Sequence, residues 1–171
     1  MRRVFLACVF LPMATAVFAI NLRSYPEVIQ NGTMMFDVGV GFGTPVYGSM
    51  LCPPISLNFE YALPVFSLPF TFGLKFAYSA DNLGFTNNNF GIAFRTAYHL
   101  NFGVPHLDTY VALNLGDIIS TPWGDYGGNS FWIGIMAGAR YYFKYQSHFG
   151  VYLEAGFDKL TYVNFGGTVR F

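Results

Sequence analysis

The sequence has few charged residues and no long apolar run beyond its first 19 residues. Charged residues make up 11% of its 171 residues, less than half the usual share of a soluble domain. After residue 20, no apolar stretch reaches the roughly 18 residues that a membrane-spanning helix needs. A membrane protein with this sequence would therefore cross the bilayer with strands, and strands can do so only as a closed barrel.

Cysteine is almost absent. Cys8 lies in the apolar stretch at the N-terminus, which leaves Cys52 alone in the rest of the chain. No internal disulfide can therefore form to stabilise a small secreted fold. We interpret Cys52 as a loop thiol, with an intermolecular bridge as the alternative.

The usual signatures of catalytic, metal and nucleic-acid sites are also absent from the sequence. No Cys/His cluster has zinc spacing, no run of Lys and Arg indicates nucleic-acid binding, and no lysine follows Gly127-Gly128 as in a phosphate-binding loop. A nucleophile needs a base within reach, and His99, His106 and His148 fall near predicted turns. We expect a non-enzymatic protein with no catalytic residue, cofactor or metal.

The first 19 residues have the pattern of a cleavable signal peptide. Arg2 and Arg3 supply its positive start, residues 4–18 its apolar centre, and Val17-Phe18-Ala19 its small-residue cleavage site. The sequence therefore predicts export, with cleavage before Ile20.

Apolar and polar residues alternate through the rest of the chain. Within residues 70–79, Phe, Phe, Leu, Phe and Tyr alternate with Thr, Gly, Lys, Ala and Ser. Successive side chains of a strand point to opposite faces, so this segment has one apolar and one polar face. The pattern recurs about eight times without a helix to cover the apolar faces. We predict an all-β fold, a transmembrane antiparallel up-and-down β-barrel of about eight strands over residues 33–171, after an N-terminal periplasmic lead at 20–32.

Turn signals divide the barrel region into strands and connections. The predicted strands are residues 33–42, 55–63, 70–79, 89–100, 108–116, 130–143, 149–157 and 161–171. The connections at 43–54, 80–88 and 117–129 are long, and the others are mostly shorter. Extracellular loops of outer-membrane barrels are longer than their periplasmic turns, so we expect these three connections to be exposed outside the cell, where they could contact a partner. The short last connection departs from this rule.

Charged residues of the predicted strands share the face of the small polar residues. They are Asp37, Glu60, Lys75, Arg95, Asp108, Arg140, Glu154 and Arg170. Because Lys or Arg facing lipid at mid-bilayer costs about 2–4 kcal/mol, we expect this face to line the lumen. All of these residues except Asp108 are assigned to a lumen charge network. Glu60 is expected to face Lys75. Arg170 is expected to lie between Glu154 and Asp37.

The same face allows two interpretations of the lumen. An eight-stranded barrel is just wide enough for side chains to fill it, which favours a closed, charge-paired plug. Alternatively, the inward glycines leave room for a narrow channel.

The end of the chain resembles the C-terminal strand by which outer-membrane barrels are recognised for insertion. Phe165, Val169 and the terminal Phe171 share its outward face. With the signal peptide and the alternation, residues 33–171 resemble the small eight-stranded bacterial outer-membrane β-barrels that include OmpX, OmpW and the OmpA barrel. The resemblance is architectural.

That resemblance implies a protein of the cell outer membrane that contacts the lipid bilayer and the bacterial barrel-insertion machinery. It implies a role in envelope structure or extracellular contact. The alternatives that it leaves open are an OmpW-like conduit for small solutes, hydrophobic ones included, and a lipid-modifying enzyme.

Overall fold

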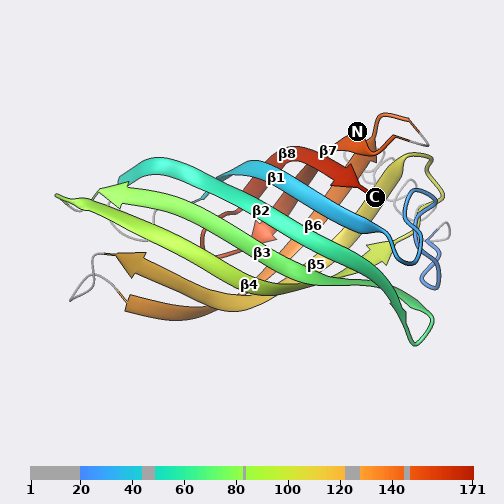
Figure 1. Ribbon diagram of the computed structural model, residues 1–171, viewed down its shortest axis with the longest axis horizontal. Coiled ribbons are helices and arrows are strands. Elements are labelled where there is room, and N and C mark those ends of the chain that lie inside the picture. Colours follow the sequence, from blue (N-terminus) through green and yellow to red (C-terminus); the bar gives the residue numbers. More distant parts are fainter. Residues whose placement is uncertain (1–19, 44–48, 83, 122–127, 145–146) are drawn as a thin grey trace, which may run out of the picture.

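The computed structural model describes residues 20–43, 49–82, 84–121, 128–144 and 147–171. Its eight strands form a closed barrel in which each strand pairs antiparallel with its neighbours in the chain and β8 pairs with β1 (Figure 1). The strands are β1 (Met34–Phe42), β2 (Ser49–Val65), β3 (Leu68–Asn82), β4 (Thr86–Leu100), β5 (Leu107–Thr121), β6 (Gly128–Tyr142), β7 (Phe149–Phe157) and β8 (Val163–Arg170). The predicted fold class is confirmed. The predicted signal peptide at 1–19 lies outside the described residues.

The alternation in the sequence explains these strands and their burial. Along β1, exposed and buried residues alternate without a break, with Phe36 and Val38 outside and Asp37 inside. Charged and amide side chains are buried in the lumen while large apolar side chains cover the exterior. This polarity is the reverse of that in a soluble barrel. Among the described residues, no helix is long and apolar enough to cross a membrane.

The predicted loop at 43–54 is wrong over its second half. Ser49–Pro54 belongs to β2 and runs beside β3, with register shifts on either side of Cys52. Pro53 and Pro54 fall within the second shift and face no partner on β1. Proline is tolerated at a bulge or on a strand edge because no ladder hydrogen bond is lost there.

The predicted loops at 80–88 and 117–129 are also mostly strand. β3 and β4 remain paired as far as Asn82 and Thr86, so that connection is only residues 83–85. β5 and β6 remain paired as far as Ser120 and Gly128. The polar residues near these strand ends misled the prediction because several of them are buried and hydrogen-bonded to one another inside the barrel. The expected alternation of long and short connections is therefore largely lost.

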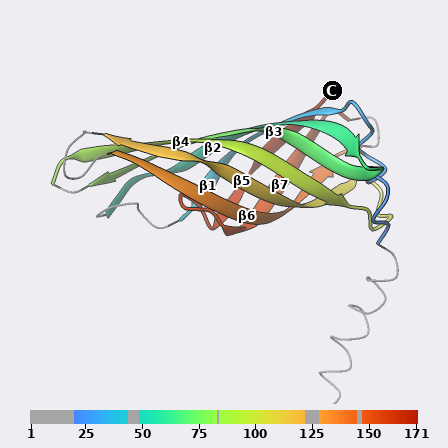
Figure 2. The same cartoon turned by 90° about the horizontal axis from the view of Figure 1, so that it is seen from below.

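The barrel wall has two unequal parts. β1 and β7 have nine residues each and β8 has eight, whereas β2 has 17 and β3 to β6 have 15 each. β6 pairs with β7 only over Ile135–Tyr142, and β2 pairs with β1 only over Ile55–Tyr61. Five strands therefore project beyond the other three (Figures 1 and 2).

We call the region where all eight strands pair the closed part, and the projecting region the distal sheet. The distal sheet comprises Ser49–Pro54, residues 78–82, 86–91 and 117–121, and Gly128–Gly134. Its two edges are Ser49–Pro54 of β2 and Gly128–Gly134 of β6, and neither pairs with another described strand on its outer side.

The lead at residues 20–32 lies against the opposite, terminal end of the barrel, where the chain also ends (Figure 2). Val28 and Ile29 are buried there with Met35, Ala62 and Tyr142. The lead is anchored by a backbone hydrogen bond from Gly32 to Ala62. These contacts make the lead a cap over the terminal mouth of the barrel.

The connection between β7 and β8 folds into the barrel. Asp158, Leu160 and Thr161 are each 1% exposed, although the sequence indicated an ordinary tight turn and a strand that begins at Thr161. Leu160 packs in an apolar cluster with Ala77, Ala93, Ile118 and Trp132. The turn thus fills the lumen where the closed part meets the distal sheet.

Candidate functional site

Arg140 of β6 stands at the centre of the charged lumen. Its Nη2 lies 2.7 Å from Asp37 Oδ2 and its Nη1 lies 3.1 Å from Asp108 Oδ2. Nη2 also donates to Glu60. All four side chains are almost fully buried. One cation therefore bridges carboxylates from β1, β2 and β5.

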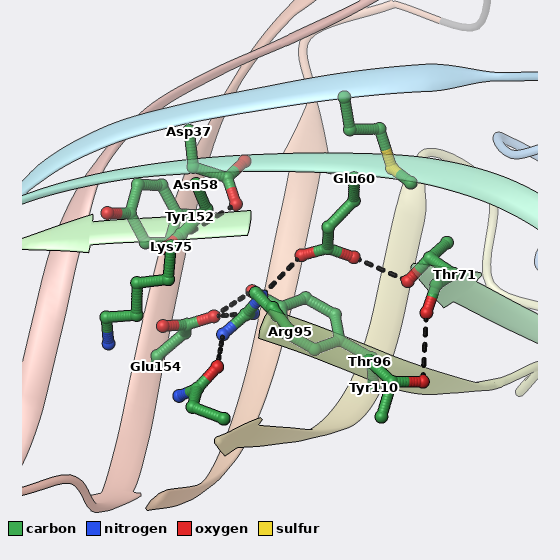
Figure 3. A network of polar contacts seen from close by, with 12 residues as sticks. Asp37, Asn58, Glu60, Thr71, Lys75, Arg95, Thr96, Tyr110, Tyr152 and Glu154 are labelled. Atoms are coloured by element: carbon green, nitrogen blue, oxygen red, sulfur yellow. Dashed lines mark hydrogen bonds and ion pairs between the residues drawn. The ribbon is translucent and has the colours of Figure 1, made fainter. Parts of the chain in front are cut away.

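Arg95 of β4 forms the second bridge. Its Nε lies 2.7 Å from Glu60 Oε1, and its Nη2 donates to Glu154 (Figure 3). Tyr110 lies beneath both guanidinium groups, with its ring centre 4.2 Å from Arg140 and 5.6 Å from Arg95. Because Glu60 accepts from both arginines, the two bridges form one network across the lumen.

Lys75 does not pair with Glu60, contrary to the sequence interpretation. Its Nζ lies 2.7 Å from Asp158 Oδ2 in the inward-folded turn, and Asn114 donates to the same oxygen at 3.0 Å. Glu60 is held by the two arginines. The prediction failed because lumen side chains reach across the barrel and are not limited to adjacent strands.

Arg170 does not lie between Glu154 and Asp37 either. It lies opposite Met35 near the terminal end of the barrel. Its Nε donates to the carbonyl of Ser147 at 3.0 Å, and its guanidinium lies 4.4 Å from the ring centre of Tyr142. The two carboxylates are paired with Arg140 and Arg95 instead.

His99 is part of a hydroxyl–imidazole–carboxylate arrangement. Its Nδ1 lies 2.6 Å from Asp108 Oδ1 and its Nε2 lies 3.1 Å from Thr71 Oγ1. The single hydroxyl proton of Thr71 is donated to Glu60 at 2.6 Å, so the imidazole does not accept it. All of these side chains are fully buried. The arrangement positions Glu60 and Asp108 and does not have the proton path of an activated nucleophile.

The other two predicted histidines lie apart from this arrangement. His106 is in the connection before β5 and has a positive φ of 68°. His148 is exposed and bonds through Nδ1 to the carbonyl of Arg170 at 2.8 Å. The three histidines are therefore not brought together.

Sequence reasoning missed three contributors to the lumen. Asp158 lay in a predicted turn, so the period-two pattern could not place it. Tyr110 carries no charge, so the charge pattern did not select it, and only the barrel geometry puts it beneath two arginines. Tyr25 of the lead donates to the carbonyl of Phe70, its ring centre lies 5.7 Å from that of His99, and burial raises the pKa of its hydroxyl to about 12.

Polar side chains also line the inner face of the distal sheet. Asn89 donates to Asp81 at 2.9 Å, and its side-chain oxygen accepts from Ser120 at 2.6 Å and from Asn87 at 3.1 Å. The lumen thus has a charged layer in the closed part, an apolar layer around Leu160, and an asparagine-rich layer in the distal sheet. Among the described residues, no group of three or more His, Cys, Asp or Glu side chains could hold a metal ion.

On the outer face of the described strands, one charged residue departs from the predicted pattern. Extension of β5 to Thr121 brings Asp117 into a strand, and its side chain is exposed on the outward face. It lies opposite Ile92 on β4 and Phe131 on β6. Phe165 and Phe171 are also exposed outside, and Val169 is half-buried.

A closed antiparallel barrel with an apolar exterior and a buried charged interior defines the class of this protein. It is a transmembrane β-barrel of the kind found in outer membranes.

Comparison with protein-family models and with curated proteins gives no match. Among solved structures, the chain is similar to the N-terminal β-barrel domain of Pseudomonas aeruginosa OprF. The two share 17% identity over 83% of this chain and 98% of that one, with a TM-score of 0.45.

Proposed function

We propose that this protein is a non-enzymatic outer-membrane barrel whose charge-filled lumen is closed to ions. In this role it anchors the distal sheet and its connections, the regions 43–54, 80–88 and 117–129, at the cell surface for envelope structure or extracellular contact. The observation that carries the proposal is the pair of fully buried arginines, Arg95 and Arg140, which together engage four carboxylates.

The energetics of buried ion pairs support a closed lumen. Removing one partner from such a pair typically costs about 3–5 kcal/mol because a charge is left buried and uncompensated. An open path through the closed part would separate several of these contacts at once. The cap at residues 20–32 adds a second obstruction at the terminal mouth.

The two edges of the distal sheet differ in a way that favours contact at β6. Unpaired edges can accept an added strand, and proline blunts them. The β2 edge contains Pro53 and Pro54, whereas Gly128–Gly134 contains neither proline nor charge. An extracellular polypeptide would therefore find ladder hydrogen-bonding groups on the β6 edge.

The proposal includes the route by which the barrel reaches the membrane. Export would use the signal peptide at 1–19, and the insertion machinery would recognise the outward apolar face formed by Phe165, Val169 and Phe171. The terminal end of the barrel would then face the periplasm and the distal sheet the exterior.

Conductance across planar lipid bilayers tests the closed lumen. The folded protein is identified by heat-modifiable gel migration. Its insertion is verified by protease protection in vesicles of the same lipid. After insertion, we expect no steady current. Steady currents that scale with the amount of inserted protein would contradict the proposal and favour the conduit alternative.

A further inference from the structure

A groove of about 500 Å³ crosses the outer face of the barrel from β1 to β5. Its lining is almost entirely apolar and includes Val38, Leu57, Phe76, Phe90, Ile92 and Ile119. These outward side chains belong to the surface that we assign to lipid. Because most of this lining lies on the closed part, which we place in the bilayer, an acyl chain is the occupant that the groove's position and chemistry select.

The only charged side chain that points outward from the described strands lies beside this groove. Asp117 is exposed, and its cross-strand neighbour Ile92 lines the groove. No described residue forms an ion pair with its carboxylate. All other charged residues of the described strands lie on the inward face. Asp117 is therefore an exception to the rule that charged side chains are disfavoured on the lipid-facing surface of a barrel.

The polar boundary of the apolar exterior lies next to the same site. Tyr78 lines the groove, and its hydroxyl donates to Asn88 at 2.9 Å. Asn82 and Asn129 are exposed near the distal ends of β3 and β6. Asp117 therefore lies at the level where the apolar exterior gives way to polar side chains, which is where lipid headgroups are found.

We infer that the groove binds one lipid of the outer leaflet, with an acyl chain along Leu57 and Phe76 and an amine-bearing headgroup at Asp117. The apolar lining accommodates the chain, and the unpaired carboxylate selects a positive charge at the headgroup. This inference rests on the proposed membrane location, and it names a lipid partner that the closed lumen does not require.

Electron paramagnetic resonance with spin-labelled lipids tests the site. The protein is reconstituted into phosphatidylcholine vesicles with either a spin-labelled long-chain amine or the matching long-chain alcohol. The motionally restricted fraction gives the relative association constant of each probe. We expect the amine to associate more strongly by roughly two- to fivefold, the factor that corresponds to an exposed ion pair.

Two variants separate the headgroup from the chain. Asp117→Asn should remove the preference for the amine while leaving the restricted fraction of the alcohol unchanged. Leu57→Trp, which fills the groove, should lower the restricted fraction of both probes. Leu153→Trp is the matched control, because Leu153 is an exposed apolar residue outside the groove, and it should change neither value.

The outcomes distinguish this inference from the proposed membrane location. Equal association of the two probes with the wild type, or an amine preference that survives in Asp117→Asn, would overturn the lipid site while leaving the barrel in the membrane. If neither the wild type nor the control variant Leu153→Trp shows a motionally restricted fraction for either probe, the membrane location itself would be contradicted.

Discussion

The closed part and the distal sheet have the same alternating pattern but different interiors. In the closed part, eight strands surround a lumen filled by arginine–carboxylate contacts. In the distal sheet, β3, β4 and β5 contribute hydrogen-bonded asparagine and serine side chains together with Asp81, and β2 and β6 form two unpaired edges. The arginine–carboxylate network therefore lies where backbone pairing is complete, whereas the distal sheet holds a smaller, asparagine-rich network around Asp81.

The difference follows from the surroundings of each part. A barrel wall in lipid must satisfy every backbone group internally, and its narrow interior holds charges only when they are paired. A strand of 9–11 residues spans a bilayer, so β1, β7 and β8 are about as long as a bilayer crossing requires. The extra length of β2 to β6 extends toward the headgroups and the exterior.

The largest expected effect comes from removing the cation that bridges the closed part. Arg140→Ala leaves three carboxylates buried around an empty position and should lower the free energy of unfolding by about 3–5 kcal/mol or more. Urea titration of the protein in detergent micelles measures the change. Lys159→Ala, which loses a contact with Ser130 near the distal sheet, should cost about 0.5 kcal/mol or less. Equal losses would remove the distinction between the two parts.

An outward charge should be more harmful in the closed part than at the tip of the distal sheet. Leu74→Arg places a cation on the apolar exterior and should lower the free energy of unfolding by about 2–4 kcal/mol. Asn82→Arg, at the exposed end of the same strand, should lower it by about 0–1 kcal/mol. Unfolding titrations after refolding into vesicles provide the measurement. Similar costs at the two positions would mean that the apolar exterior does not end where we place it.

A smaller effect tests how tightly the closed lumen is packed. A Cβ at Gly138 would lie 2.4 Å from the ring of Tyr110, so Gly138→Ala should cost about 1–3 kcal/mol through overpacking. Gly167→Ala is the control, because a Cβ there meets no atom within 4 Å. Thermal unfolding in micelles compares the two variants. Equal melting temperatures would show that the lumen is looser than the contacts of Tyr110 indicate.

Much of the fold could be predicted from the sequence because successive side chains of every strand point alternately to the exterior and to the lumen. The period-two pattern placed Asp37 and Glu154 inside and Leu74 and Phe76 outside, and it located β7 at Phe149–Phe157 as observed. Strand ends were harder to predict. Polar inward residues such as Asn89 resemble loop residues until the interior that satisfies them is known.

The pairing inside the lumen could not be predicted from the sequence. Partners such as Arg140 and Asp37 are 103 residues apart in the chain, and their contact depends on side-chain length and on the curvature of the closed barrel. Asp158 enters the lumen only because its turn folds inward. Asp117 was assigned to a loop, so its outward position became visible only when β5 proved longer than expected.

Thiol labelling compares the two parts most directly. Cys52 is a half-buried cysteine in the distal sheet, and Ala112 is a fully buried lumen residue of the closed part. The Ala112→Cys protein in vesicles is treated with a membrane-impermeant thiol reagent, and mass spectrometry scores the two sites separately. We predict that Cys52 is modified and residue 112 is modified only after unfolding. Modification of both sites at similar rates in the folded protein would contradict a closed lumen.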